Sequence, residues 1–190
     1  NRVNFVAPPS GFPALDSVHL SNYNGTFGSP FRETLLFSKV DYATTPNSAM
    51  EFSFSNRRET DVRDFGNNQA VQTAVNFRQN VSIGQVKHSW FSGAWLNEAK
   101  VDYSRFRRNP SPNDPGMASR EYLYSNTNAV IGSNLSTQDF IQKRIGLRDD
   151  MTYSGFQAGA QHVVKMGASV DFVNYVITKD PDGTPRFESR

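Results

Sequence analysis

The 190-residue chain contains no cysteine, so it can form no disulfide and hold no cysteine-ligated metal or redox centre. It also lacks any run of about 18 apolar residues, which excludes a membrane-spanning helix of the usual kind. The first residues, Asn-Arg-Val-Asn, have neither the basic start nor the apolar stretch of a signal peptide. We therefore expect either a mature protein or a piece of a longer one. The net charge of +2 is too small to predict a nucleic-acid partner.

Motifs for catalysis and for cofactor binding are missing as well. The HExxH, GxSxG and GxGxxG patterns do not occur. The three histidines, His19, His88 and His162, are scattered without metal-site spacing. Asp149 and Asp150 are adjacent, and adjacent strand residues point to opposite faces, so these carboxylates should not share a proton. We predict no enzymatic activity, no cofactor and no metal.

The chain is instead rich in aromatic residues, with 15 Phe and 7 Tyr, and in alternating patterns. Residues 160–176 are the clearest example. Val164, Met166, Ala168, Val170 and Phe172 fall on one face of an extended strand, whereas Lys165, Gly167, Ser169 and Asp171 fall on the other. A strand with one oily and one charged face suits a wall between hydrocarbon and water. A tilted strand needs roughly 9–11 residues to cross a bilayer.

Further alternating segments fill residues 31–190, whereas residues 1–30 are rich in proline and glycine and are predicted to be irregular. Short turns are expected at 45–47, 92–93 and 154–158, with the last centred on Ser154-Gly155, and another at 180–183. Gly84 is expected to mark a bulge or a turn. Residues 56–68 and 107–137 are predicted to be long polar loops, and only residues 117–124 could tolerate a helix. A new strand is expected to start at Arg186-Phe187.

Short turns thus alternate with long loops along the chain. Outer-membrane barrels show this asymmetry, with short periplasmic turns and longer extracellular loops. We therefore predict an all-β fold, an antiparallel up-and-down β-barrel in which residues 31–190 form part of a larger barrel. The basic residues Arg105, Arg107 and Arg108 would form a solvated rim, with contact to anionic lipopolysaccharide or nucleic acid as the less favoured interpretation.

Four segments resemble strands of the TonB-dependent receptors, and of their Oar-like subgroup in particular. Residues 96–108, LNEAKVDYSRFRR, resemble the L-x-N-E-x-R-x-x-Y-S-R strand of that family. Residues 143–153, KRIGLRDDMTY, resemble its Y-x-L-x-D-x-x-x-W strand, and residues 162–170, HVVKMGASV, its H-x-x-K-x-G strand. Residues 183–187, GTPRF, are similar to the N-G-x-F-x-F start of the next strand. The segments occur in the family's order and spacing.

The resemblance implies a bacterial outer-membrane location, in a barrel of roughly 22 strands that contains a plug. It also implies import of a bulky nutrient ligand, with energy from the TonB complex and contact with outer-membrane lipid. The chain shows no plug domain, no TonB-contacting box and no terminal aromatic residue, so it would be a central segment of seven or eight strands. Ligand contacts would then lie in 56–68 and 107–137, although the substrate-binding residues stay unknown.

Two alternatives remain open from the sequence. The first is a soluble all-β module, a sandwich or small barrel that binds a ligand such as a carbohydrate. It requires the even-numbered face of residues 164–172 to pack against a second sheet. The second is an enzyme whose site is hidden in the sequence. It requires His88 or His162 to lie in a pocket within hydrogen-bond reach of a serine or a carboxylate.

Overall fold

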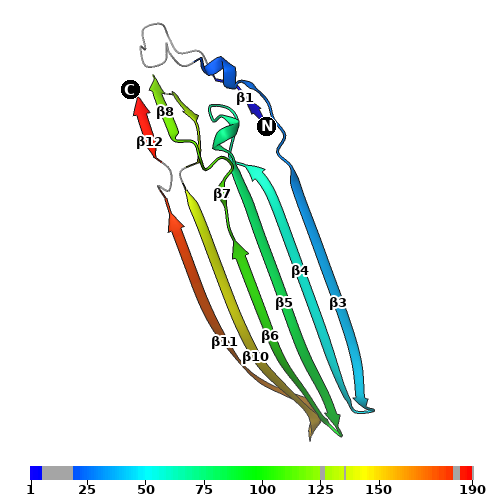
Figure 1. Ribbon diagram of the computed structural model, residues 1–190. Coiled ribbons are helices and arrows are strands. Elements are labelled where there is room, and N and C mark those ends of the chain that lie inside the picture. The colour runs from blue at the N-terminus through cyan, green and yellow to red at the C-terminus, as the bar shows by residue number, and fades with distance from the viewer. Residues whose placement is uncertain (6–18, 125–126, 135, 182–184, 190) are drawn as a thin grey trace.

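The computed structural model describes residues 1–5, 19–124, 127–134, 136–181 and 185–189. These residues form an all-β, largely antiparallel structure, as predicted. Six long strands form one sheet. Figure 1 shows them running side by side, with short elements gathered at one end. The N-terminus and the C-terminus both lie at that end (Figure 1).

The long strands are 14–22 residues in length, far above the typical 5–6 residues of a soluble protein. Each long strand is antiparallel to its neighbours, and the order across the sheet is β3-β4-β5-β6-β10-β11. A two-residue strand, β7, pairs with the start of β5. The bounds are β3 (Phe31–Thr45), β4 (Ser48–Arg63), β5 (Val75–Ser92), β6 (Trp95–Arg108), β7 (Ser111–Pro112), β10 (Thr137–Ala158) and β11 (Ala160–Asp180).

The strand pairing brings residues of one kind into rows across the sheet. Residues directly opposite each other in paired strands share a face, so each row collects side chains of one face from neighbouring strands. One row consists only of apolar residues: Val170, Leu147, Val101, Val86, Phe52 and Val40. The adjacent row, on the opposite face, is polar: Ser169, Arg148, Lys100, Lys87, Glu51 and Asp41. The alternation predicted for residues 164–172 therefore extends across the whole sheet.

The short turns all lie at the end of the sheet away from the termini (Figure 1). They consist of residues 46–47, residues 93–94 and Gly159 alone. Gly93 has φ +58° and Gly159 has φ +71°, a left-handed conformation that favours glycine. The turn predicted at Ser154-Gly155 is wrong in position. The strand continues to Ala158, and the register shift between Tyr153 and Phe156 is a β-bulge within β10.

Two further predictions along the long strands are wrong. The expected loop 56–68 is strand up to Arg63, and only residues 64–74 connect β4 to β5. Its charges are paired in the sheet, because Arg57 contacts Glu33 on β3 and Glu59 on its own strand at 3.1 Å each. This pairing explains why a strand resembled a solvated loop. Gly84 is neither a bulge nor a turn, because its pairing with Phe54 and Tyr103 continues without a shift.

The short elements form a cap at the other end of the sheet. The expected loop 107–137 contains β7, β8 (Ser119–Tyr124) and β9 (Thr127–Ile131), so the prediction of one long loop is wrong. The position that could tolerate a helix, 117–124, is largely strand β8. The strand expected at Arg186 exists as β12 (Arg186–Ser189), but it pairs in parallel with β8 instead of extending the long sheet. The turn predicted at 180–183 includes residues that lie outside the described ones.

The leading segment contributes to the same cap. It contains β1 (Arg2–Val3), the 3-10 helix η1 (Leu20–Tyr23) and β2 (Gly25–Thr26), and the β4–β5 connection adds the 3-10 helix η2 (Val71–Thr73). The hydrophobic core of the described residues lies here and not under the long sheet. Its buried members are Val3, Phe5, Leu20, Phe65, Ala70, Ala74, Tyr122, Ala129 and Ile131.

Candidate functional site

The face of the sheet with the clearest apolar character carries a continuous apolar band. We use this name for the five rows that run from Val164 to Phe172 on β11. These rows include most of the large apolar side chains of that face: Val164, Met166, Val170, Phe172, Ile145, Leu147, Met151, Tyr153, Trp95, Val101, Tyr103, Val86, Trp90, Phe52, Phe54 and Val40. Two polar pairs interrupt the band. Asn97 Nδ2 donates a hydrogen bond to Asp149 Oδ1 at 2.7 Å, and His88 Nε2 lies 2.8 Å from Ser48 Oγ.

The apolar band has no covering layer among the described residues. Phe172 is 59% exposed, Met166 is 55% exposed and Val101 is 50% exposed. Such a large exposed apolar surface is unusual for a monomer in water and indicates contact with lipid or with another protein. Within the described part of the chain, the even-numbered face of residues 164–172 therefore does not pack against a second sheet. The soluble alternative needed that packing.

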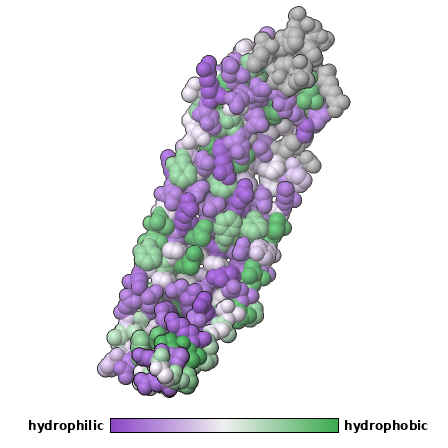
Figure 2. Space-filling model, turned by 180° about the vertical axis from the view of Figure 1, so that it is seen from behind, coloured by the Kyte–Doolittle hydropathy of each residue, from purple (hydrophilic) through white to green (hydrophobic). Residues whose placement is uncertain are grey.

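The opposite face carries ion pairs, and we call it the charged face. Lys39 contacts Glu51 at 2.9 Å, and Lys87 contacts Glu98 at 2.6 Å, each across two neighbouring strands. Figure 2 views the molecule from behind and shows hydrophilic side chains crossing the sheet as a band between two more hydrophobic zones. The two faces of the same strands thus differ in character.

A three-strand ion-pair network lies at the centre of the charged face. Arg144 on β10 contacts Asp102 on β6 and, at 2.7 Å, Asp171 on β11. Lys100 approaches Asp102 from the same strand at 3.3 Å. Asp102 is only 5% exposed, so its charge depends on these two cations for compensation. The network ties together β6, β10 and β11.

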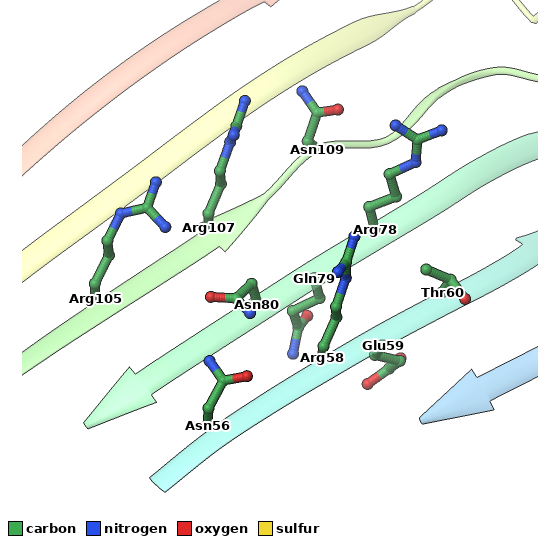
Figure 3. A pocket seen from close by; sticks show the side chains of 10 residues that line it. All are labelled: Asn56, Arg58, Glu59, Thr60, Arg78, Gln79, Asn80, Arg105, Arg107 and Asn109. Atoms are coloured by element: carbon green, nitrogen blue, oxygen red, sulfur yellow. The ribbon is translucent and has the colours of Figure 1, made fainter. Parts of the chain in front are cut away.

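Beyond the apolar band, towards the cap, the same face becomes strongly basic. We call this region the basic cluster, and it consists of Arg32, Arg58, Arg78, Arg105, Arg107 and Lys143. Lys143 and Arg105 pair opposite each other in the row next to the band, two residues beyond Ile145 and Tyr103. Arg58 and Arg107 follow in the second row, and Arg32 and Arg78 in the third. Figure 3 shows Arg58, Arg78, Arg105 and Arg107 projecting from three neighbouring strands.

The arginines of the basic cluster are separated by neutral polar residues. Asn80 on β5 pairs opposite both Arg58 on β4 and Arg107 on β6, so the two arginines are about 10 Å apart at the backbone. Together with Asn56, Thr60 and Asn109 they line a shallow pocket of about 710 Å³. This spacing limits the repulsion between the cations while leaving their guanidinium groups on one surface.

Only one carboxylate among the described residues forms a salt bridge with the basic cluster. Arg107 donates two hydrogen bonds to Asp139, at 2.9 and 2.8 Å. Asp139 lies beyond the apolar band, and the hydrogen bonds from Arg107 lower the pKa of its carboxyl group below the usual range. No carboxylate in the described part of the chain lies within 4 Å of the guanidinium nitrogens of Arg58, Arg78 or Arg105. The cluster is therefore electrostatically unbalanced.

The residues considered for catalysis are not assembled into a pocket with several reactive groups. His88 Nε2 lies 2.8 Å from Ser48 Oγ, and Thr44 donates a hydrogen bond to the same oxygen at 2.8 Å. The enzyme alternative requires a histidine within hydrogen-bond reach of a serine inside a pocket. The contact between His88 and Ser48 meets the distance requirement, but it lies on the open apolar face. His162 lies beside the Gly159 turn, where its ring nitrogen contacts the Ala158 carbonyl oxygen at 3.1 Å.

The two adjacent carboxylates point to opposite faces, as the strand geometry predicted. Asp149 accepts its hydrogen bond from Asn97 on the apolar face, whereas Asp150 contacts Arg148 on the charged face. Among the described residues, no three His, Asp or Glu side chains come together in a way that could hold a metal ion. Neither short helix in the described part of the chain has the length or the apolar character to cross a membrane.

The sequence suggested only part of the basic cluster. It singled out Arg105, Arg107 and Arg108, but the structure places Arg108 on the opposite face, 5.2 Å from the ring centre of Phe77. The other basic residues lie on different strands, and only the register brings them together. Comparison with known proteins found no matching family model, no matching curated protein and no matching solved structure.

Proposed function

We propose that this chain forms part of the wall of a bacterial outer-membrane β-barrel of the TonB-dependent receptor type. The observation that carries the proposal is the apolar band, which is exposed on one face of the sheet while ion pairs fill the other face at the same height. A barrel wall in a bilayer needs this division, with apolar side chains towards lipid and polar side chains towards the lumen.

The dimensions of the apolar band support a bilayer crossing. From residue 164 to residue 172, β11 rises by about 26 Å at roughly 3.3 Å per residue. A strand tilt of 35–45° reduces this to about 20 Å along the membrane normal, close to the roughly 25 Å apolar band of outer-membrane barrels. The strands are longer than the band, so their remaining length would extend beyond the bilayer on the side of the cap.

The orientation follows from the connections. The three short turns would face the periplasm, and the cap would lie outside the cell. Ligand contacts would then come from residues 64–74 and 109–136, which replace the loop ranges expected from the sequence. The ligand would be a bulky nutrient, and the charged face would line its path through the lumen.

Closure of the barrel requires strands beyond the six long ones described. β3 and β11 each pair with one long neighbour, which leaves two edges with unpaired backbone groups. Lipid does not tolerate such edges, so further strands must pair there in the membrane. On this proposal the TonB complex would act through other parts of the receptor. Import by cells with and without a working TonB complex would test that step.

A second candidate is a soluble all-β module that binds a ligand such as a carbohydrate. It needs a partner to cover the apolar band, whereas a bilayer covers the band without further assumptions. A protein that stays monodisperse and monomeric without detergent would support the soluble module and contradict the barrel wall.

Site-directed spin labelling tests the membrane proposal directly, because the chain has no native cysteine to remove. Val170→Cys places a label on the apolar band, and Ser169→Cys places one on the charged face of the same strand as a matched control. In phosphatidylcholine bilayers the label at 170 should collide often with oxygen, which concentrates in lipid, and rarely with a water-soluble nickel chelate. The label at 169 should show the reverse preference.

Each alternative result has a distinct meaning. Low access to both reagents at position 170 would indicate packing against protein and would support the soluble module. High access to the nickel chelate at both positions would show that neither face meets lipid, and the proposal would be wrong.

A further inference from the structure

We infer that the basic cluster binds the phosphorylated headgroup of an anionic lipid in the outer leaflet, while the acyl chains of that lipid lie on the apolar band. The inference rests on the proposed function, because it needs the band to be in a membrane. It goes beyond that function by assigning a specific lipid-binding surface on the outside of the wall, separate from the path of the nutrient.

Position is the first argument. Arg105 and Lys143 occupy the row next to Tyr103 and Ile145 on the same face, so the basic cluster begins where the apolar band ends. An anionic lipid has the same arrangement, with a charged headgroup next to its acyl chains. A lipid whose chains cover the band would therefore bring its headgroup to the height of the arginines.

Charge is the second argument. Six basic side chains share this surface, and within the described residues only Asp139 forms a salt bridge with any of them. On the charged face, by contrast, basic residues such as Arg144 and Lys39 contact carboxylates of the chain itself. A surface with five surplus positive charges is complementary to a headgroup that carries several negative charges.

The chemistry of the side chains specifies phosphate. A guanidinium group offers planar pairs of donors that match two oxygens of one phosphate, and it keeps its charge at any physiological pH. Arg58, Arg78 and Arg105 are available for this role, because none of them has a salt bridge in the described part of the chain. The amide side chains of Asn80 and Asn109 line the same pocket and can donate to sugar or phosphate oxygens.

Lipid binding to the purified protein in detergent micelles tests the inference, with native mass spectrometry as the readout. The probes are diphosphorylated lipid A and the same lipid with both phosphates removed. The protein should retain the phosphorylated lipid strongly and the dephosphorylated lipid weakly. Added salt should reduce the difference, because it screens charges at the surface.

Variants locate the binding. Arg58→Gln, Arg78→Gln and Arg105→Gln together should weaken binding of diphosphorylated lipid A by tens of fold to about a hundredfold, at roughly fivefold for each basic residue near a charged lipid surface. Replacing the same three residues with Lys should retain most of the affinity. The matched control removes the same charge from the charged face, with Arg148→Gln, Lys165→Gln and Lys179→Gln, and should bind as the original protein does.

Three results would overturn the inference. Equal binding of the two lipids would show that phosphate is not recognised, and equal weakening by the control variant would show only a general charge effect. Displacement of lipid A by an equal concentration of inorganic phosphate would show a site for free phosphate and not for a lipid. Spin labels at position 170 in pure phosphatidylcholine distinguish the two proposals: lipid contact there without phosphate preference would overturn the lipid site alone.

Discussion

Gly146 lies directly opposite Asp102 in the pairing of β10 with β6, and a methyl group at Gly146 would lie 2.9 Å from Asp102 Oδ1. The same methyl group would lie 2.9 Å from Asp171 Oδ1 on the other side. Because Gly146 has no side chain, there is room for Arg144 to form ion pairs with both carboxylates. A glycine in the middle of a strand usually weakens it. Here a larger side chain would crowd the carboxylates of Asp102 and Asp171.

Gly146→Ala should destabilise the sheet by about 1–3 kcal/mol, the usual range for an overpacked site. The added methyl group must displace Asp102, which is buried and held by Arg144 and Lys100. The free energy of unfolding in urea is the measurement. Gly84→Ala is the matched control, since a methyl group there has open space within 4 Å and should change stability much less. Equal effects of the two substitutions would contradict this account.

The burial of Asp102 leads to a second prediction. Asp102→Asn keeps the shape of the side chain but removes the charge, and it leaves Arg144 and Lys100 with less compensation. We expect a loss of about 2 kcal/mol in the free energy of unfolding, because Arg144 and Lys100 lose the buried carboxylate that compensates their charges. Asp41→Asn is the comparison. Asp41 contacts Lys39 at 3.6 Å but is well exposed, so its loss should have little effect.

The sequence predicted the long strands well where apolar and polar residues alternate strictly. Residues 164–172 show why, because four of the five apolar side chains there lie opposite an apolar residue of β10. The prediction failed at residues 56–63, where Arg57 and Glu59 gave the composition of a loop. Their charges are tolerated in a strand because Arg57 contacts both Glu59 and, on β3, Glu33. The contact with Glu33 depends on the register.

The cap and the basic cluster could not be predicted because each brings together segments that lie far apart in the sequence. Val3 pairs with Asn67, and Gln69 pairs with Val130, so segments far apart in the sequence form the cap together. The basic cluster likewise draws its residues from different strands. Arg105 and Arg107 were visible as part of a basic run, but nothing in the sequence placed Arg58 and Arg78 beside them.

The two tryptophans provide a third prediction, on the depth of the sheet in lipid. Trp90 and Trp95 lie on the apolar band near the short turns, and the ring of Trp95 lies 4.4 Å from that of Tyr153. Aromatic side chains of this kind form the girdles at the membrane interface. In bilayers, lipids brominated near the headgroup should quench the tryptophan fluorescence more than lipids brominated at the chain ends. Stronger quenching from the chain ends would place the short turns inside the bilayer and contradict the proposed orientation.

The cap depends on a backbone contact at Gly132, which gives the last prediction. Gly132 has φ +87°, and a methyl group there would lie only 2.1 Å from the carbonyl oxygen of Ala118, next to β8. Gly132→Ala should therefore destabilise the cap by at least about 2 kcal/mol, since it adds a clash to an unfavourable backbone conformation.

Hydrogen exchange measures this effect by region. The amides of β8 and β9 should lose protection in the Gly132→Ala variant, because Tyr122 and Ile131 in the buried core belong to these strands. The amides of β10 and β11 should keep their protection, since those strands pair with each other over their whole length. Gly116→Ala is the control, because Gly116 also lies between β6 and β10 and the nearest atom to a methyl group added there is 4.0 Å away. If protection were lost in the long strands as well, the cap and the sheet would unfold together, and ligand contacts in the cap could not change without disturbing the wall.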